Sequence, residues 1–308
     1  MKSDFKLHIL LYHGVTSIKS KGIENSSNKH IHVDSFEREM AFIKKNYPIL
    51  SMNEVINIYK KKKKINGEYF AVTFDDGFKN NFTDAYPILL KYEVPATFYI
   101  STGMINSKKL FWVDKIECCI NNSKKNKFDI KIQNKYYSFD LSNKFSKIKA
   151  LTEIKKLCKL LPKKNKDKVI KDLSSTLNIT PSIKYGKNYE TLTWANVRKM
   201  NKSKLITFGA HTIDHDILSY LKKNEMEYQV TESIKKLSSE ISENVRHFSY
   251  PEGQQNHFNK DVIRFLKKKG IHCSPSAING ICSSKDNLFN LKRIMVGFNN
   301  LKFPKKIK

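Results

Sequence analysis

Two adjacent carboxylates end an apolar run in the first third of the chain. Residues 70–74 are rich in aromatic and β-branched side chains, and Asp75, Asp76 and Gly77 follow directly. Such a run is typical of a buried strand, and α/β folds place their chemistry in loops just beyond the carboxyl ends of parallel strands. Two neighbouring carboxylates repel each other unless a cation or an arginine offsets their charge. The stretch therefore predicts a cation site whose other ligands lie elsewhere in the sequence.

A pair of histidines follows a second apolar run. His211 and His215 stand four residues apart, directly after residues 205–210. Two such histidines reach one metal ion if the segment turns like a helix, and two solvated histidines are the alternative. Because both constellations follow predicted strands, we expect them at one edge of the sheet. One aspartate and two histidines leave coordination positions open, which is typical of a catalytic metal site.

A third segment, residues 246–253, contains an arginine and a Pro-Glu-Gly turn. Arg246 could pair with the carboxylate that does not bind metal and hold it ionised. A surface salt bridge is the alternative for this arginine. The turn at Pro251, Glu252 and Gly253 exposes backbone N–H groups that could face an oxyanion.

The elements that must position these residues alternate between strand and helix, which predicts an α/β fold with a parallel sheet. The patterns predict strands at 7–12, 70–74, 96–100, 205–210, 246–250, 271–274 and 292–296. They predict helices at 35–46, 53–60, 83–92, 226–241 and 261–269, and a further helix that begins near residue 193. Residues 104–190 interrupt this alternation. We expect one catalytic domain over residues 1–308, with an inserted, mainly helical subdomain at about 104–190.

The composition limits the classes of partner and compartment. The chain has 308 residues and a net charge of +28, but its lysines are spread along the whole length. This pattern favours weak contact with anionic surfaces, such as a membrane, over specific nucleic-acid binding. Five cysteines without CxxC spacing fit a reducing compartment. With no apolar stretch long enough for a signal peptide or a bilayer span, we expect a cytoplasmic protein.

Three motifs together carry a family resemblance. The segments 73–77, 211–215 and 246–253 resemble, in order and spacing, the first three motifs of the polysaccharide deacetylase family. This is carbohydrate esterase family 4, the chitooligosaccharide deacetylase homology domain, and the similarity covers roughly residues 7–100 and 190–298. It implies a distorted (β/α) barrel of about seven parallel strands. It also implies one divalent metal ion, usually zinc, and hydrolysis of N-acetyl groups on amino sugars.

The resemblance assigns roles residue by residue. It implies that Asp76, His211 and His215 hold the metal ion and that Asp75 is the general base. Arg246 would orient Asp75. The metal and the backbone N–H near Glu252 would stabilise the oxyanion.

The residue that would protonate the leaving nitrogen, the general acid, does not match the usual family pattern. Many members carry a late histidine after an apolar strand, but residues 291–296 contain none. Relatives with a circularly shifted motif order use a histidine after the first strand, and residues 11–14 resemble that arrangement. The resemblance therefore implies His13 as the acid, with His257 and His272 as alternatives.

The resulting hypothesis is a metal-dependent deacetylase that acts on an N-acetylated sugar. The sugar would belong to a polysaccharide or to a lipid- or nucleotide-linked precursor of surface polysaccharide. Two other hypotheses fit the same residues. One is a carbohydrate-binding protein with impaired catalysis, and the other is a non-haem iron oxygenase that uses the Asp/His/His set.

Overall fold

The computed structural model describes residues 4–63, 65–298 and 303. It contains two compact units. Unit 1 comprises Met1–Ser17, Ser27–Ser107 and Thr191–Lys308, and unit 2 comprises Ile18–Ser26 and Lys108–Glu190.

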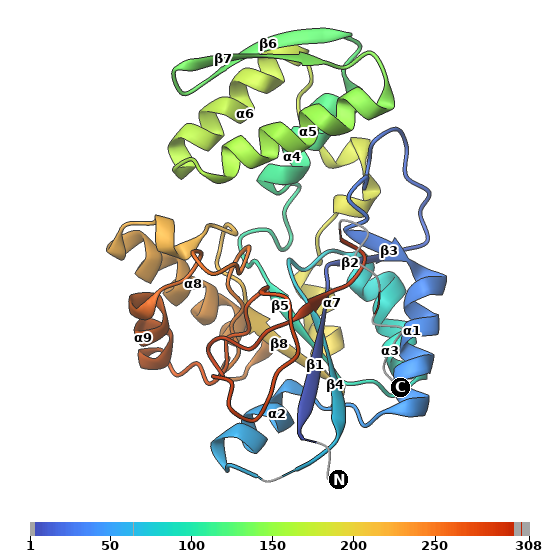
Figure 1. The fold of residues 1–308 in the computed structure, drawn as a ribbon, viewed down its shortest axis with the longest axis vertical. Helices are drawn as coiled ribbons and strands as arrows, with labels where there is room; N and C mark the ends of the chain where they lie inside the picture. Colours follow the sequence, from blue (N-terminus) through green and yellow to red (C-terminus); the bar gives the residue numbers. More distant parts are fainter. Residues whose placement is uncertain (1–3, 64, 299–302, 304–308) are drawn as a thin grey trace. The chain divides into compact units, whose positions relative to one another are not determined.

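Unit 1 is built on a five-stranded parallel sheet (Figure 1). Its order is β8-β5-β4-β1-β9, and every neighbouring pair is parallel. The strands are β1 (Lys6–Tyr12), β4 (Glu68–Phe74), β5 (Ala96–Ile100), β8 (Ile206–Ala210) and β9 (Ile294–Met295). Because all five run the same way, their carboxyl ends meet at one edge, as the sequence predicts.

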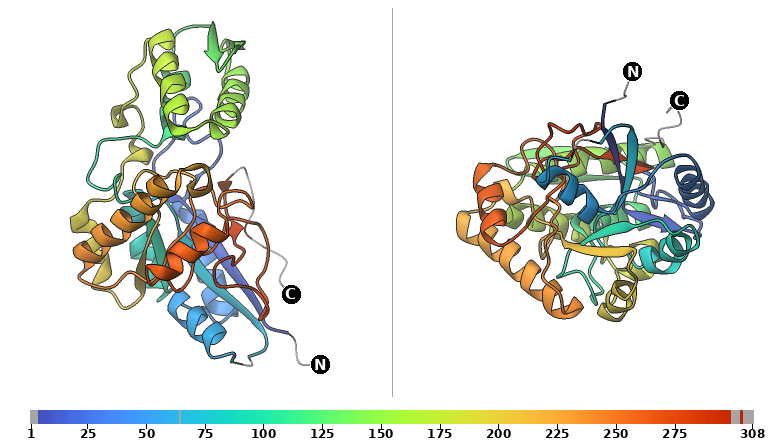
Figure 2. Two further views of the ribbon diagram at one scale, coloured as in Figure 1. Left: turned by 90° about the vertical axis from the view of Figure 1, so that its left-hand side faces the viewer. Right: turned by 90° about the horizontal axis from the view of Figure 1, so that it is seen from below.

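Helices surround this sheet in unit 1 (Figure 2). They bury apolar faces against aromatic strand residues, among which the rings of Phe74 and Phe98 stack 4.6 Å apart. The helices are α1 (Val33–Asn46), α2 (Met52–Lys60), a π-helix (Asn81–Ala85) continued by α3 (Tyr86–Lys91), α7 (Trp194–Asn201), a 3-10 turn (Leu218–Tyr220), α8 (Lys223–Ile241) and α9 (Lys260–Lys268). A short pair, β2 (Gly14–Thr16) and β3 (His30–His32), precedes α1.

The expected barrel of about seven strands is not confirmed. The segments predicted as strands at 246–250 and 271–274 form only isolated parallel bridges, Ala210 to Phe248 and His247 to Cys273. Each is followed by a proline, Pro251 or Pro275, which cannot donate to a ladder. These segments therefore extend the sheet beyond β8 without forming regular strands.

Unit 2 has its own core, formed by a β-hairpin and three helices. Its elements are α4 (Trp112–Asn122), β6 (Lys127–Ile132), β7 (Lys135–Asp140), α5 (Lys144–Lys159), α6 (Lys163–Leu177) and two 3-10 turns, Ile183–Tyr185 and Lys187–Tyr189. Compared with the expected insertion at 104–190, this unit also includes residues 18–26. The side chain of Asn121 joins them, because its Oδ1 accepts from the Ile23 N–H at 2.8 Å.

Candidate active site

The carboxyl edge of the sheet in unit 1 collects the predicted residues. Asp75 follows β4 directly, and its N–H donates to the Tyr12 carbonyl at the end of β1. His211 follows β8, and its N–H donates to the Ile100 carbonyl at the end of β5. Parallel register thus brings segments from four strands to one place.

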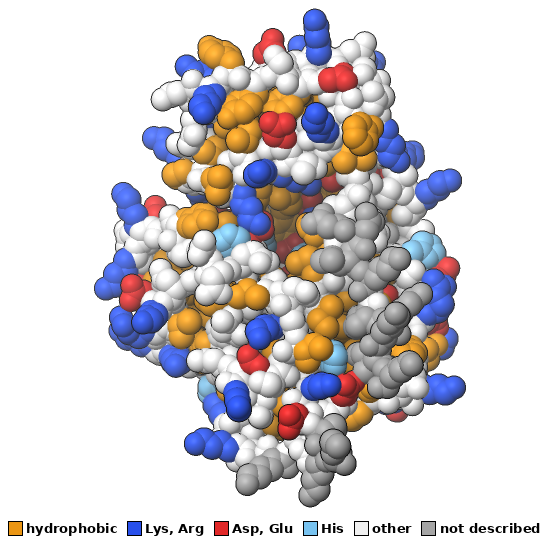
Figure 3. Space-filling view, in the orientation of Figure 1, with side chains coloured by type: hydrophobic (Ala, Val, Ile, Leu, Met, Phe, Trp, Pro, Cys, Tyr) orange, Lys and Arg blue, Asp and Glu red, His pale blue; other side chains and the backbone are white. Residues whose placement is uncertain are grey.

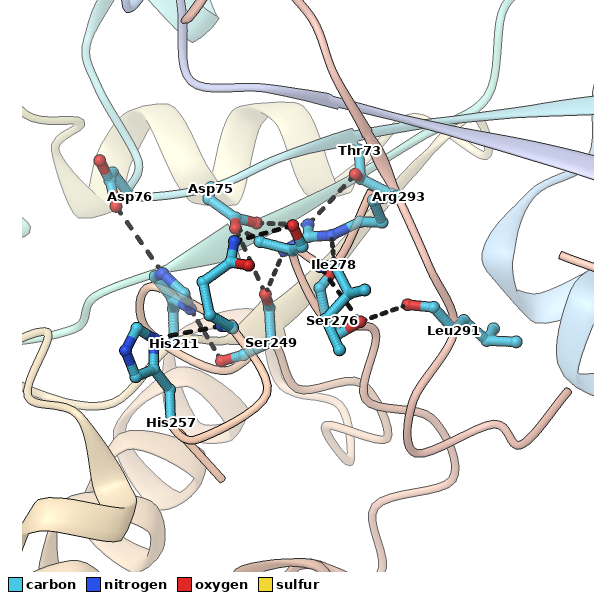
Figure 4. Close-up of polar contacts among 12 residues, drawn as sticks. Thr73, Asp75, Asp76, His211, Ser249, His257, Ser276, Ile278, Leu291 and Arg293 are labelled. Atoms are coloured by element: carbon cyan, nitrogen blue, oxygen red, sulfur yellow. Dashed lines mark hydrogen bonds and ion pairs between the residues drawn. The ribbon is translucent and has the colours of Figure 1, made fainter. Parts of the chain in front are cut away.

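Asp76, His211 and His215 converge on one point. One ligand atom from each lies within 4.8 Å of the others. Asp76 Oδ1 is 3.3 Å from His215 Nε2. It is 3.7 Å from His211 Nε2, the contact drawn in Figure 4. Asp76 and His211 are buried, and His215 is half-buried. The structure therefore brings together the three residues predicted as ligands.

The protonation of His211 suits a metal ion. Its Nδ1 lies 2.8 Å from the Ser249 carbonyl oxygen, which can only accept, so Nδ1 carries the proton. Nε2 then presents its lone pair toward the Asp76 carboxylate. A lone pair and a carboxylate that face each other repel, and a cation bound between them removes this repulsion. A set of two imidazole nitrogens and one carboxylate oxygen suits a divalent ion that binds further ligands.

The loop that carries the two histidines is not helical, contrary to the geometry we expected. Thr212 and His215 have left-handed φ values of 64° and 60°, and Asp76 has 76°. Such values are uncommon for residues other than glycine and cluster at functional sites. Thr212 Oγ1 accepts from the His215 N–H at 2.9 Å, and Gln229 of α8 accepts from two further N–H groups of the loop. A tied loop, and not a helical turn, directs both imidazoles to Asp76.

Asp75 is held by an arginine that the sequence analysis did not select. Arg293 donates Nη1 to Asp75 Oδ1 at 2.8 Å and Nη2 to Oδ2 at 2.7 Å, and its side chain is fully buried (Figure 4). Its other donors reach the Ser276 carbonyl and the hydroxyls of Thr73 and Ser249. Burial by itself would raise the pKa of Asp75, but the Arg293 guanidinium and the nearby histidines outweigh it and lower this pKa from 3.8 to about 2.

The assignment of Arg246 as the partner of Asp75 is wrong in this structure. Arg246 is exposed, whereas the hydroxyl of Ser249 lies 3.3 Å from Asp75 Oδ2. Arg246 precedes Ser249 by three residues, which is about 10 Å along an extended segment toward the amino ends of the strands. Because successive side chains of an extended segment point to opposite faces, Arg246 and Ser249 point to opposite faces. Arg246 therefore lies on the outer face near the amino edge. The available signal for the true partner was an arginine directly before the apolar residues 294–296, which form the end of a predicted strand.

The three candidate acids lie in different places. His13 follows β1 at the carboxyl edge, and burial together with the charges of Lys29, Arg293 and His215 lowers its pKa to about 3 despite the opposing effect of Asp75. His257 is buried on the loop after Gly253, and its Nδ1 accepts from the Gln254 N–H at 3.1 Å (Figure 4).

His272 is not part of this edge. Its N–H donates to the Arg246 carbonyl, and burial followed by the charges of Lys60 and Arg246 lowers its pKa. Lys60 ends α2, which precedes β4, so His272 belongs to the amino edge with Arg246.

The expected turn for an oxyanion is present as a tight backbone reversal. Glu252 and Gly253 have φ values of 61° and 54°. The Gly253 carbonyl accepts from the Ala277 N–H, and a Cβ at Gly253 would lie 2.6 Å from that nitrogen. The close approach requires glycine here.

Comparisons with known proteins identify the family of this chain. The family model described as polysaccharide deacetylase matches residues 62–274. YxkH of Bacillus subtilis, which carries a polysaccharide deacetylase name, is 33% identical over 104 residues, covering 33% of this chain and 34% of that protein. A poly-beta-1,6-N-acetyl-D-glucosamine N-deacetylase of Staphylococcus aureus is 34% identical over 98 residues, covering 32% of each. The match thus spans about a third of the length of these relatives.

Solved structures share the fold over nearly the whole chain. The Streptococcus pyogenes deacetylase PplD, solved in complex with acetate, has a TM-score of 0.63 and 18% identity, covering 97% of this chain and 96% of its own. IcaB from Ammonifex degensii has a TM-score of 0.60 and 15% identity, covering 96% and 93%. At these identities the likeness concerns the fold, whereas the family model covers well over half of the sequence. The chain belongs to the polysaccharide deacetylase family.

Proposed function

We propose that this protein is a metal-dependent hydrolase that removes N-acetyl groups from amino sugars. One observation carries the proposal. The Asp76, His211 and His215 group lies beside a buried carboxylate, Asp75, that Arg293 keeps ionised. A ligand set next to a separately held base is what amide hydrolysis requires, because an amide is a poor electrophile.

We propose that Asp76, His211 and His215 hold the divalent ion, which suits zinc by its N and O donors. A divalent ion held there supplies polarisation of the acetyl carbonyl and lowers the pKa of water. The protein's part is to fix the donors. Ser249 holds the His211 tautomer, and the left-handed backbone at His215 aims the second imidazole.

Asp75 acts as the base in this proposal. Its two oxygens accept hydrogen bonds from Nη1 and Nη2 of Arg293, so the carboxylate is fixed in orientation and is charged at neutral pH. It accepts the proton of the attacking water. A pKa of about 2 makes it a weak base, so the proton leaves the water as the new C–O bond forms.

The departing nitrogen needs a proton, for which we propose His13, with His257 as the alternative. Burial lowers the pKa of His13 to about 3 and keeps its imidazole neutral at neutral pH. His13 therefore serves as an acid only if bound substrate raises this pKa. His257 holds its proton on Nε2, because its Nδ1 accepts a hydrogen bond.

The proposed substrate is a polymer or a carrier-linked precursor that contains N-acetylated hexosamine. The name of the Staphylococcus aureus relative, which specifies poly-beta-1,6-N-acetyl-D-glucosamine, supports this class. Among the described residues, no helix combines the length and the apolar character needed to cross a bilayer.

The decisive experiment measures acetate and free amine released from β-1,6-linked N-acetylglucosamine oligosaccharides. We expect both products from zinc-loaded protein and their loss on chelation, with recovery when zinc is returned. Absence of both products with zinc, cobalt and nickel across a panel of N-acetyl sugars would refute the proposal.

A further inference from the structure

Positive charge is concentrated in unit 2. This unit contains 23 lysines, no arginine and nine carboxylates in 92 residues, so it carries +14 of the net +28 of the chain. Figure 3 shows lysine and arginine side chains spread over the face in view. None of the residues proposed for catalysis lies in this unit, so the chemistry of the metal site does not explain the charge.

A groove of about 330 Å³ lies within unit 2, between the end of α4 and the start of α5. Four lysines line it, Lys124, Lys125, Lys144 and Lys147, and no carboxylate does. Lys147 Nζ donates to the carbonyls of Asn121 and Ser123 at 3.2 and 3.3 Å, which ties the first turn of α5 to the end of α4. The remaining three lysines are exposed, so their charges are available to a ligand.

Apart from Gly22, Ile23 and Leu141, the rest of the lining is polar. It includes the amides of Asn121, Asn126 and Asn143 and the hydroxyls of Ser123 and Ser142. Asn121 is anchored on both sides, since Oδ1 accepts from Ile23 N–H and Nδ2 donates to the Lys21 carbonyl.

Two carboxylates are adjacent in sequence to lining residues, Glu24 beside Ile23 and Asp140 beside Leu141, and both are engaged. Glu24 accepts from the Lys21 N–H at 3.3 Å and from Asn188 Nδ2 at 3.1 Å. Asp140 accepts from the Ser142 N–H at 2.8 Å and from the Ser146 hydroxyl at 2.6 Å. It is therefore directed to the chain itself, which leaves the lysines of the rim without a carboxylate among the lining residues.

We propose that this groove binds an acidic sugar unit, one that carries a carboxylate or a phosphate ester. Lysines attract the anionic oxygens, and amides and hydroxyls match sugar hydroxyls. The volume lies at the lower end of the range of ligand pockets. The choice of a sugar as the ligand rests on the proposed function, whereas the preference for an anion rests on the groove itself.

The lining disfavours two other anionic partners. No aromatic ring lines the groove, so bases of single-stranded nucleic acid have nothing to stack on. Its two branched apolar side chains, Ile23 and Leu141, are buried, so neither is available for insertion into a lipid surface. Phe145, beside Lys144, is exposed but is not part of the lining.

The test uses the full chain and a charge-matched pair of triple variants. K124E/K125E/K144E alters the rim of the groove, and Lys147 is left intact because it supports the structure. K164E/K168E/K171E makes the same charge change at exposed positions of α6 in the same unit. Thermal melts of both variants establish that they fold.

Binding is measured by fluorescence anisotropy at 150 mM salt with labelled hexagalacturonate, its neutral methyl ester and a phosphorylated maltohexaose. We expect the wild type to bind one or both acidic sugars and not the ester, and the two acidic probes identify the anion. The groove variant should bind at least about tenfold more weakly, because each substitution removes an attractive charge and also adds a repulsive one beside the anion. The α6 variant should change by less than about threefold.

Three outcomes would overturn the proposal. In the first, the wild type binds neither acidic sugar. In the second, both variants bind equally more weakly than the wild type. In the third, binding that depends on the groove is seen only with a single-stranded nucleic acid 20-mer or with phosphatidylglycerol vesicles. Release of acetate from a neutral N-acetylglucosamine oligosaccharide is measured on the same variants and should not change. If the wild type releases no acetate, the proposed function is refuted. The anisotropy measurements then still test the groove independently.

Discussion

The two edges of the parallel sheet in unit 1 contain similar residue types and differ in how these are assembled. At the carboxyl edge, Asp76 meets two histidines beside the buried Asp75–Arg293 pair. At the amino edge, His247 Nε2 is paired with Asn53 Oδ1 at 2.8 Å, and Arg246 is exposed. At the carboxyl edge, two of the proposed metal ligands, Asp76 and His215, have left-handed backbone, whereas His247 and Arg246 at the amino edge do not. Position along the strands, more than residue type, thus separates reactive chemistry from structural pairing.

The largest expected effect separates the two arginines. Arg293→Ala leaves the Asp75 carboxylate buried without its partner, and breaking a buried pair in this way costs about 3–5 kcal/mol. Arg246→Ala removes an exposed side chain and should change stability by less than about 0.5 kcal/mol. Urea unfolding and acetate release measure both variants. Equal losses in the two variants would mean that the amino edge also contributes to the site.

The next effect concerns the ligand set. His211→Ala should sharply lower zinc content, because it removes one of three donors that lie within 4.8 Å of one another. His247→Ala is the matched control at the other edge and should keep its zinc. Elemental analysis after gel filtration measures both, and full zinc occupancy in His211→Ala would exclude this histidine as a ligand.

The two adjacent aspartates should differ in the same assay. Asp75→Asn retains the metal donors but loses the proton acceptor, so we expect intact zinc content and a turnover lowered on the order of 10²–10⁴-fold. Asp76→Asn should lose zinc as well. Near-normal turnover in Asp75→Asn would assign the base to another group.

The proton donor gives a smaller, pH-dependent effect. His13→Ala should retain zinc, lower turnover and abolish the alkaline limb of the pH–rate profile, whereas His257→Ala should keep that limb. The opposite pattern would transfer the acid role to His257. In the protein without substrate, NMR should show His13 neutral down to about pH 4, because burial lowers its pKa to about 3.

The smallest effect on activity is expected at the amino edge. Burial first, and then the charges of His272 and Arg246, lowers the pKa of His247 from 6.5 to about 4. Below pH 6.5 the His247 imidazole becomes protonated in the unfolded chain but stays neutral in the folded protein. The free energy of unfolding therefore falls as the pH decreases toward 4. The contribution of His247 lost between pH 7 and 5 is about 2 kcal/mol, at 1.36 kcal/mol per pKa unit.

His247→Gln should make this decline shallower and leave acetate release at pH 7 unchanged. Urea unfolding at several pH values measures the slope. An unchanged slope would show that His247 is protonated in the folded protein or is not responsible for the decline.

The sequence by itself determined the main strands and the order in which the proposed ligand residues follow them. Residues 70–74 and 205–210 contain enough aromatic and β-branched side chains to be recognised as strands without their neighbours. Asp75, Asp76 and His211 follow those strands directly, so parallel pairing was sufficient to place them at one edge. These are local patterns, and the structure has β4 and β8 at the predicted places.

The tertiary structure decided which arginine serves the site and how its loops are held. Arg293 and Asp75 are 218 residues apart, and their contact depends on β9 pairing beside β1. The direction of Arg246 depends on the two-residue alternation of an extended segment, and a shift of one residue would reverse it. The non-helical turn at His215 likewise depends on Gln229 of α8. Side-chain contacts between distant segments require the positions of both backbones, which no local pattern contains.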